Sequence, residues 1–226
     1  MRKEVVVTVV LLATLLAGCG GGGGGGMVAP LPQLRQMRAG DTWNYRVTLT
    51  DGMDRVVTTA RIRVDPATGI DLVGNTYRLV EITFGPPANI DVIAYLSQDL
   101  GGSVWQHGDF TDGAEELVAA PYGGKVLVTK SPFVVGDRYQ YNISYNTGAW
   151  ESGSTEVVVR ETVTVPAGTY EAYRVARRTC AGGVTALTTH WYVPEVGHIV
   201  RGVMELSVGT TTYQCTLEMT SATRGK

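Results

Sequence analysis

The sequence is poor in the residues that most often bind metals or act as nucleophiles. Its 226 residues include only three histidines and three cysteines. None of the histidines lies at the spacing of a metal site, and neither an H-E-x-x-H nor a C-x-x-C motif occurs. A G-x-S-x-G nucleophile elbow is missing as well. We therefore predict that the protein is not an enzyme and needs no metal or other cofactor.

Charge is also scarce, and neither sign dominates. Charged residues make up 18% of the chain, which holds 19 basic and 21 acidic side chains. Removal of an amino-terminal export signal, residues 1–18, would take away two basic residues and one acidic residue. The mature chain would then have a net charge of about −3. No basic run or patch is visible, so nucleic acid is excluded as a partner.

Long apolar runs are missing too, except at the amino terminus. There, Arg2 and Lys3 precede thirteen residues, Val5 to Ala17, that are apolar apart from two threonines. A helix needs about twenty apolar residues to cross a bilayer. This run is therefore too short for a membrane span, and it predicts an export signal.

The signal ends at Leu16-Ala17-Gly18-Cys19, which resembles the lipobox of bacterial lipoproteins. The resemblance implies cleavage between Gly18 and Cys19, a diacylglyceryl group on the Cys19 sulfur, and acylation of the new amino terminus. In that family an aspartate after the cysteine commonly retains the protein in the inner membrane. Gly20 stands there instead, which by analogy favours the periplasmic face of the outer membrane. An ordinary secretory signal and an uncleaved anchor remain the alternatives.

Seven glycines, Gly20 to Gly26, follow the cysteine and have no side chains with which to pack. We interpret residues 19–35 as a flexible tether with a root-mean-square reach of about 20–24 Å. The predicted organisation is then a signal peptide (1–18), the lipidated cysteine with its tether (19–35), and a folded domain (36–226).

From residue 40 onward, apolar and polar residues alternate with the period of a β-strand. Trp43, Tyr45 and Val47 are separated by polar residues, and the same pattern recurs from Tyr139 and again from Val200. Turn-forming segments such as "PATG" and "GPPAN" separate the runs, and no convincing helical stretch occurs. The sequence therefore predicts an all-β fold.

The two halves of this region match each other at an offset of 96 residues. "GDTWNYRV" from Gly40 falls on "GDRYQYNI" from Gly136, and further segments fall in register without a gap. We predict two tandem β-units, roughly residues 36–131 and 132–226, that complete a single sheet system. The Gly-Asp pair before the first strand of each unit predicts a turn.

The second unit also resembles a broad group of uncharacterised bacterial envelope domains. These carry a V-x-V-P-A-G-T-aromatic hairpin and then W-aromatic-x-P-x-V-G, here "VTVPAGTYEAYRV" and "WYVPEVGHIV". The resemblance covers about residues 136–205 and implies a strongly curved antiparallel sheet or incomplete barrel, but no reaction. The first unit departs from the pattern, with "VDPATG" and "YLSQDLGG" in these places.

Two cysteines remain if Cys19 carries lipid. In an oxidising compartment, Cys180 and Cys215 are expected to form a disulfide that closes a loop of about 36 residues and stabilises the fold by about 3–4 kcal/mol. Two separate buried thiols are the alternative, because Cys215 lies on a clear apolar face.

Polar residues that gather in the sequence have plain interpretations. Asp109, Asp112, Glu115 and Glu116 lack the spacing of a calcium loop, and we interpret them as a solvated loop.

His190 and His198 flank the "WYVPEVG" hairpin, with Glu195 at its tip. We expect these side chains to be solvated, and a surface cation site is the alternative interpretation.

Arg174, Arg177 and Arg178 stand together on one predicted strand. Protection of a sheet edge is favoured over contact with an anionic ligand. Trp150 is expected to fold back over the end of the sheet rather than touch a partner.

These observations predict an exported, all-β protein that is attached to the membrane through its amino-terminal lipid. Two classes of activity stay open. In the first, the curved sheet holds an apolar ligand such as an acyl chain, in a cavity of about 300–1,000 Å³. In the second, the domain is a structural or interaction module that docks onto an envelope protein through loops or a strand edge.

Overall fold

The computed structural model describes residues 32–51, 54–87, 90–111, 113–119, 124–182, 184–208 and 211–225. The predicted signal peptide, Cys19 and the glycine run lie outside these residues. The described chain is built from strands and turns and contains no helix, so the all-β prediction is confirmed. Accordingly, a search of the described residues for a helix able to span a bilayer found none. The strands are β1 (Thr42–Thr50), β2 (Arg55–Ile70), β3 (Thr76–Phe84), β4 (Asp91–Gln98), β5 (Val104–Thr111), β6 (Ala114–Leu117), β7 (Val126–Thr129), β8 (Arg138–Ser144), β9 (Trp150–Val165), β10 (Gly168–Ala181), β11 (Val184–Val193), β12 (His198–Val208) and β13 (Thr211–Thr223).

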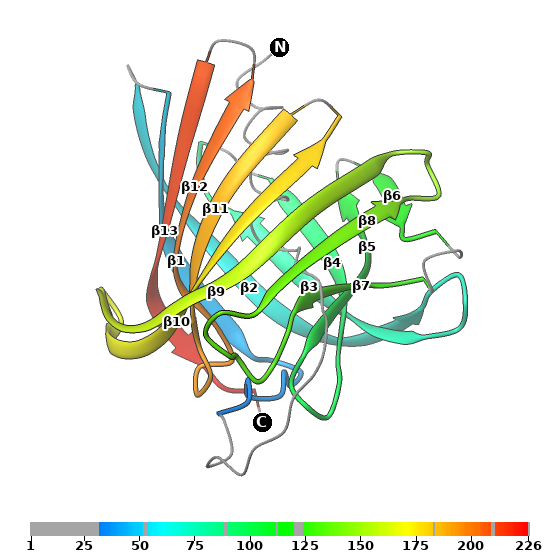
Figure 1. The fold of residues 1–226 in the computed structure, drawn as a ribbon, viewed down its shortest axis with the longest axis horizontal. Helices are drawn as coiled ribbons and strands as arrows, with labels where there is room; N and C mark the ends of the chain where they lie inside the picture. The colour runs from blue at the N-terminus through cyan, green and yellow to red at the C-terminus, as the bar shows by residue number, and fades with distance from the viewer. Residues whose placement is uncertain are drawn as a thin grey trace.

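All of the strands belong to one antiparallel sheet (Figure 1). Its order is β6-β5-β4-β3-β2-β1-β13-β12-β11-β10-β9-β8, and β7 pairs with β5 beside β6. The first six strands form one meander and β8 to β13 form a second, and pairing between β1 and β13 joins the two. Consecutive strands are therefore neighbours in space, as short hairpin connections require.

The sheet curves so strongly that its two ends approach each other. Near β6 and β8 a single bridge links Val118 to Tyr145. Beside it, the Asn146 amide donates to the Leu117 carbonyl over 2.9 Å. No continuous ladder joins β6 to β8 among the described residues, so the sheet is not closed into a barrel. The predicted strongly curved antiparallel sheet or incomplete barrel is confirmed.

The turns before β1 and β8 are built alike. Gly40 and Gly136 both have positive φ, +83° and +93°, which favours glycine at each position. The Gly40 amide donates to the Val64 carbonyl, and the Gly136 amide donates to the Val157 carbonyl, both over 2.8 Å. The turn predicted at each Gly-Asp pair is therefore present.

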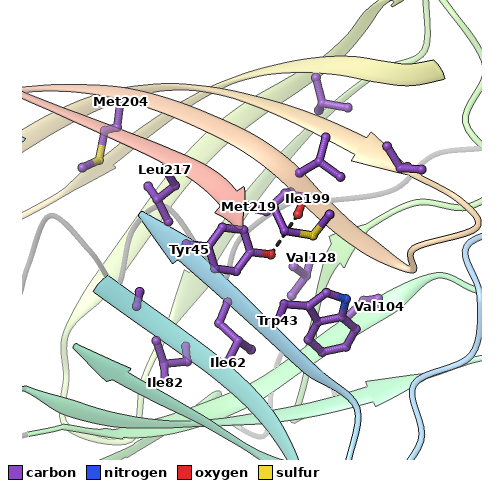
Figure 2. Close-up of a cluster of buried hydrophobic side chains, with 14 of the residues drawn as sticks. Trp43, Tyr45, Ile62, Ile82, Val104, Val128, Ile199, Met204, Leu217 and Met219 are labelled. Atoms are coloured by element: carbon purple, nitrogen blue, oxygen red, sulfur yellow. Dashed lines mark hydrogen bonds between the residues drawn. The ribbon is translucent and has the colours of Figure 1, made fainter. Parts of the chain in front are cut away.

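The concave face carries the hydrophobic core (Figure 2). On β1, Trp43, Tyr45 and Val47 point inward and are at most 1% exposed, because alternate residues of a strand share one face. The Tyr45 hydroxyl donates to the Ile199 carbonyl over 2.8 Å, so this buried polar atom is satisfied. Each large aromatic buries about 150–250 Å², which stabilises the fold by roughly 4–6 kcal/mol at ~25 cal/mol per Å².

The chain leading into β1, here called the entry segment (residues 32–41), packs against the sheet. Leu34 is buried in the core, and its amide donates to the Ser131 hydroxyl over 2.9 Å. The amides of Arg35 and Met37 donate to the Pro194 carbonyl and the Gln98 side chain. The predicted tether boundary at residue 35 is therefore too late, because Leu34 and Arg35 already belong to the folded domain.

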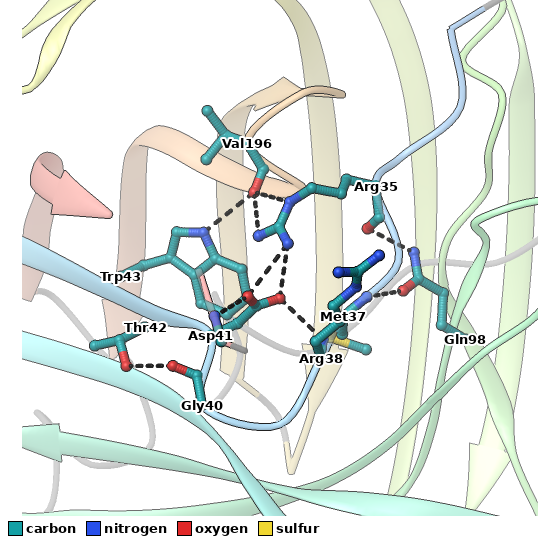
Figure 3. Close-up of polar contacts among 10 residues, drawn as sticks. Arg35, Met37, Arg38, Gly40, Asp41, Thr42, Trp43, Gln98 and Val196 are labelled. Atoms are coloured by element: carbon teal, nitrogen blue, oxygen red, sulfur yellow. Dashed lines mark hydrogen bonds and ion pairs between the residues drawn. The ribbon is translucent and has the colours of Figure 1, made fainter. Parts of the chain in front are cut away.

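The side chain of Arg35 locks this segment in place (Figure 3). Its Nη1 lies 3.0 and 3.2 Å from the two carboxylate oxygens of buried Asp41. Its Nε and Nη2 donate to the Val196 carbonyl, which also accepts the indole N–H of Trp43 over 3.3 Å. The charge of Asp41 is thus paired where it is buried.

The predicted Cys180–Cys215 disulfide is not formed, since both thiols are free. Cys180 lies on β10 and Cys215 on β13, with β11 and β12 between them. Three strand spacings amount to about 14 Å, whereas the Cα atoms of a disulfide lie within about 7 Å. The alternative of separate thiols is the one observed, and burial raises the pKa of Cys215 to about 12.

Candidate functional site

The concave face is apolar around β1 and β13, but toward the β8–β11 end of the sheet buried polar side chains point inward. Arg177 on β10 is only 5% exposed and is flanked by threonines on both neighbouring strands. We call Thr155, Arg177 and Thr188, on β9, β10 and β11, the polar row. The buried inward-facing polar residues of this region are Thr155, Arg177, Thr179, Thr188 and His190.

Strand register brings the polar row together. Arg177 stands directly opposite Thr155 on one side and Thr188 on the other. Side chains that face each other across neighbouring strands have Cβ atoms about 4.5–5.5 Å apart. His190 follows Thr188 by two residues on β11 and therefore shares its face.

Arg177 is held by partners on one side only. Its Nη2 lies 3.2 Å from a carboxylate oxygen of Glu151 and also donates to the Tyr141 hydroxyl, which in turn donates to Glu151. Its Nε donates to the Thr179 hydroxyl over 3.0 Å. The buried cation is thus neutralised by one carboxylate and fixed in orientation, while Nη1 is left without a hydrogen-bond partner among the described residues.

Unsatisfied polar atoms concentrate in this region. Among the described residues, five buried side-chain nitrogen or oxygen atoms lack a hydrogen-bond partner, and four of them belong to the polar row and His190. They are Thr155 Oγ1, Arg177 Nη1, Thr188 Oγ1 and His190 Nε2. A buried polar atom without a partner costs about 1–3 kcal/mol, so a group that satisfied all four would be strongly favoured.

The four atoms share one chemical property, since each can donate a hydrogen bond. Arg177 Nη1 can only donate, and a threonine hydroxyl has one O–H to give. Burial, followed by the charges of Arg177 and His198, lowers the pKa of His190 to about 3, so its imidazole is neutral near pH 7. A neutral imidazole carries one N–H, which its tautomer can place on Nε2. A chemical group with several acceptor oxygens therefore complements the site.

The predicted acidic loop lies on β5 and β6, at the opposite edge of the sheet from the polar row, and its interpretation as a solvated loop was wrong for Asp109. This residue is buried, and Glu116 pairs opposite it on β6. Burial, then the charges of Glu116 and Glu151, raise the pKa of Asp109 to about 7, although a hydrogen bond from Thr111 opposes the shift. Asp109 is thus close to half-protonated near neutral pH.

The other members of the acidic group behave differently. Glu115 is exposed and accepts the Tyr95 hydroxyl over 2.8 Å, while Glu116 accepts the Thr147 hydroxyl over 3.0 Å. Asp112 lies outside the described residues.

The three arginines of β10 are divided between the two faces. Arg177 points inward and Arg178 is exposed on the outer face, while Arg174 lies 3.6 Å from Glu161. Because β10 lies between β9 and β11, the prediction that these charges protect a sheet edge was wrong.

The remaining aromatic and histidine predictions also need correction. Trp150 is 54% exposed rather than folded over the sheet end. His198 stacks on Trp43 with ring centroids 4.6 Å apart, and its Nδ1 lies 2.8 Å from the Tyr45 hydroxyl. His190 is buried, so neither histidine is a solvated hairpin residue. No group of three or more metal-ligating side chains occurs among the residues that the structure describes.

A broad hollow of about 1,040 Å³ lies over β8 to β12 on the outer face. Charges of both signs line it, including Arg138, Glu156, Arg178 and Glu205, together with the exposed side chain of Leu187. Arg138 and Glu156 already pair with each other at 2.8 Å. The polar row residues Thr155, Arg177 and Thr188 are also among the residues that line this hollow, so the hollow and the polar row share the same three strands. The exposed charges of the hollow are of both signs.

No protein-family model and no curated protein sequence matches this chain. Three solved structures are similar in fold. A protein from Bacteroides fragilis described as exported, with a YmcC-like fold, is 16% identical, with a TM-score of 0.47 over 85% of this chain and 100% of its own.

A protein from Parabacteroides distasonis described as a lipoprotein is 16% identical, with a TM-score of 0.46 over 86% of this chain and 100% of its own. The hypothetical lipoprotein YmcC from Escherichia coli is 12% identical, with a TM-score of 0.40 over 83% of this chain and 92% of its own. At these identities and TM-scores the similarity says nothing about function.

Proposed function

We propose that the protein is a lipid-anchored protein of the cell envelope whose β-domain binds a compact oxyanion, a carboxylate or phosphate group, on the polar row. The observation that carries the proposal is the set of four buried donors without partners around Arg177. An oxyanion offers several acceptor oxygens in a small volume, and its hydrogen bonds with a guanidinium are charge-assisted and therefore strong.

The inner face favours this ligand over an apolar one. Around β1 and β13 the concave face is filled by the protein's own side chains, which pack on one another (Figure 2). Phe133, from the segment before β8, adds to this packing by stacking on Tyr173 with ring centroids 5.1 Å apart. An acyl chain would have to displace that packing, whereas an oxyanion at the polar row would satisfy groups that now lack partners.

The charges around the row are compatible with an anion. Arg177 supplies a fixed positive charge that Glu151 offsets. Asp109 carries about half a negative charge near pH 7, because its pKa is raised to about 7, chiefly by burial. The charge of Glu151, the partner of Arg177, is among the causes that raise the pKa of Asp109. A further negative charge bound beside Glu151 should favour the protonated form of Asp109 as well, so binding should take up protons and weaken as the pH rises above 7.

The membrane attachment rests on residues 16–19 and is part of the same proposal. Lipid on Cys19 would attach the chain to the periplasmic face of the outer membrane. The diacylglyceryl group and the acylated amino terminus together supply more than the two acyl chains that durable attachment requires. A Cys19→Ser variant is then expected to lose metabolic palmitate label and to remain uncut. A cleaved, soluble product would contradict the proposed anchor.

Binding is tested on the mature protein extracted in detergent, by isothermal titration with inorganic phosphate and with acetate. Arg177→Gln should weaken binding at least tenfold, since it removes the positive charge and the Nη1 donor. Arg178→Gln, the next residue but on the outer face, is the matched control and should bind as the natural protein does. Equal affinities for the two variants would reject the polar row as the site.

Arg177→Gln leaves Glu151 without its cation and can disturb the fold, so Thr188→Val provides a second, milder variant. It keeps the shape of the side chain and removes one donor that has no partner. We expect a three- to tenfold loss of affinity. Unchanged affinity in Thr188→Val would exclude Thr188 from the site. No heat of binding for either anion with the natural protein would leave the docking module as the explanation of the domain.

A further inference from the structure

A second buried polar group lies on the outer face of the first meander, away from the polar row. Ser97 at the end of β4, His107 on β5 and Asp71 in the turn after β2 form a continuous chain of hydrogen bonds. The Ser97 hydroxyl lies 2.8 Å from His107 Nε2, and His107 Nδ1 lies 2.7 Å from Asp71 Oδ2. The three residues are 26 and 10 positions apart along the chain, so no short motif contains them.

The backbone conformation at His107 directs its side chain toward Ser97 and Asp71. The β4–β5 register shifts between Tyr95 and Leu96, which leaves His107 as the extra residue of a β-bulge. Gly108 follows with φ of +153°, and a Cβ there would come within 2.1 Å of the Glu116 carbonyl oxygen. Bulges re-aim side chains and are frequent beside active sites.

Hydrogen bonds from the turn that follows β2 hold the Asp71 carboxylate in one orientation. Its Oδ1 accepts the amides of Val73 and Asn75, at 3.0 and 2.8 Å. Its Oδ2 accepts the Asn75 side-chain amide over 2.7 Å in addition to His107. Burial alone would raise the pKa of Asp71, but these hydrogen bonds outweigh it and lower the pKa to about 2, so the carboxylate is ionised.

An ionised Asp71 decides where the protons lie. A carboxylate only accepts, so His107 must carry its proton on Nδ1, and Nε2 then accepts the hydroxyl proton of Ser97. Burial, helped by the charge of Lys125 and opposed by Asp71, lowers the pKa of His107. The imidazole is therefore neutral near pH 7, which is the state that a general base requires.

The three hydrogen-bonded residues differ in their exposure to solvent, and the serine is the most exposed. The side chains of Asp71 and His107 are fully buried, whereas Ser97 is only partly buried. Ser97 stands directly opposite Trp105, and Lys125 Nζ lies 5.0 Å from the centre of the Trp105 ring. Ser97 is thus the most accessible of the three residues, and it lies beside an aromatic side chain and a cation.

We propose that Ser97, His107 and Asp71 form a site that hydrolyses carboxylic esters. The Ser97 oxygen bonds to the acyl carbon while its proton passes to His107 Nε2, and that proton then goes to the leaving alcohol oxygen as the ester C–O bond breaks. Water attacks the acyl group on Ser97, gives one proton to Nε2, and releases the carboxylic acid as the proton returns to the serine oxygen. Asp71 stays ionised throughout and holds the imidazole.

The mature protein in detergent is treated with a fluorophosphonate probe, and the modified residue is located by mass spectrometry. We expect one adduct on Ser97. Ser97→Ala, which leaves the His107–Asp71 pair in place, should lose labelling and the hydrolysis of p-nitrophenyl acetate. Ser154→Ala, a serine of β9 on the outer face of the sheet, is the matched control and should keep both. Absence of an adduct, or labelling that survives in Ser97→Ala, would overturn the proposal.

A further variant separates catalysis from a purely structural network. Asp71→Asn preserves shape but no longer fixes the Nδ1–H tautomer, and we expect labelling to slow about 10²–10⁴-fold. The rate of the natural protein should rise with pH as His107 loses its proton, with a midpoint below about 6.5, and then level off. If ester hydrolysis is the same in Asp71→Asn as in the natural protein, the three residues only brace the turn.

Discussion

The concave face of the sheet has two regions with different chemistry. Around β1 and β13, in the middle of the sheet, Tyr45, Val47 and Leu217 belong to one buried apolar cluster, and the Tyr45 hydroxyl donates to the Ile199 carbonyl (Figure 2). Around β9 to β11, the same alternation turns Thr155, Arg177 and Thr188 inward and leaves atoms unsatisfied. The first region favours stability, whereas the second gives up stability, as sites for ligands commonly do.

The largest expected effect tests the apolar region around β1 and β13. Trp43→Ala removes a large, fully buried side chain together with its hydrogen bond to the Val196 carbonyl. We expect the free energy of unfolding to fall by about 3–5 kcal/mol in urea titrations. A decrease in the free energy of unfolding below about 1 kcal/mol would mean that the region around β1 and β13 is not the principal core.

A pH dependence comes next, from Asp109 on β5. The pKa of Asp109 is raised from 3.8 to about 7, first by burial, so between these values the folded protein holds a proton that the unfolded chain has released. Its stabilising contribution is therefore complete below pH ~4 and is lost as the pH rises through ~7.

Asp109→Asn, which is neutral at every pH, sharpens this prediction because it leaves the histidines unchanged. We expect its free energy of unfolding to match that of the natural protein near pH ~4 and to exceed it by about 2–4 kcal/mol near pH ~8. Denaturant titrations across this range measure the difference. A difference that does not change with pH would show that Asp109 has an ordinary pKa.

A smaller effect of opposite sign tests the polar row itself. Thr155→Val keeps the side-chain shape and removes a hydroxyl that has no partner among the described residues. Without added anion we expect the variant to be more stable by about 1 kcal/mol, since no unsatisfied group remains at that position. Thr58→Val is the control and should be destabilising, because the Thr58 hydroxyl donates to the Gly85 carbonyl over 2.8 Å. The reverse order of stabilities would remove the contrast between the apolar region and the polar row.

The smallest effect is expected at the solvent-exposed surface. Arg46 and Glu218 face each other across β1 and β13 with their charged atoms 2.6 Å apart. Because Arg46 is half-exposed, Arg46→Ala should cost at most about 0.5–1 kcal/mol, and about 1 M salt should largely abolish the difference. A loss as large as that of Trp43→Ala would contradict the assignment of the core to the concave face.

The alternation of side chains was sufficient to predict an all-β chain, whereas the strong curvature of the sheet was implied by the resemblance to envelope domains. Trp43, Tyr45 and Val47 are separated by polar residues, and that spacing alone indicates a strand with one buried face. The Gly-Asp pairs predicted turns correctly because positive φ at Gly40 and Gly136 is a local requirement. Local rules of this kind can be read without knowing which strands pair.

The candidate sites could not be predicted, because they depend on pairing between distant strands. Thr155 and Thr188 look like ordinary strand residues until the register places Arg177 between them. The disulfide prediction failed for the same reason, since Cys180 and Cys215 are compatible in spacing but lie three strands apart. The histidines were misjudged because a position beside a hairpin does not reveal whether the sheet covers it.

The entry segment has a mechanical consequence if lipid on Cys19 holds the protein by its amino terminus, as proposed above. Any tension that reaches the domain from the membrane enters at residues 32–41. These are bonded to Gln98 and Ser131 on one side and to Pro194 and Val196 on the other (Figure 3). The load is therefore shared by both meanders at once, rather than peeling one strand from its neighbour.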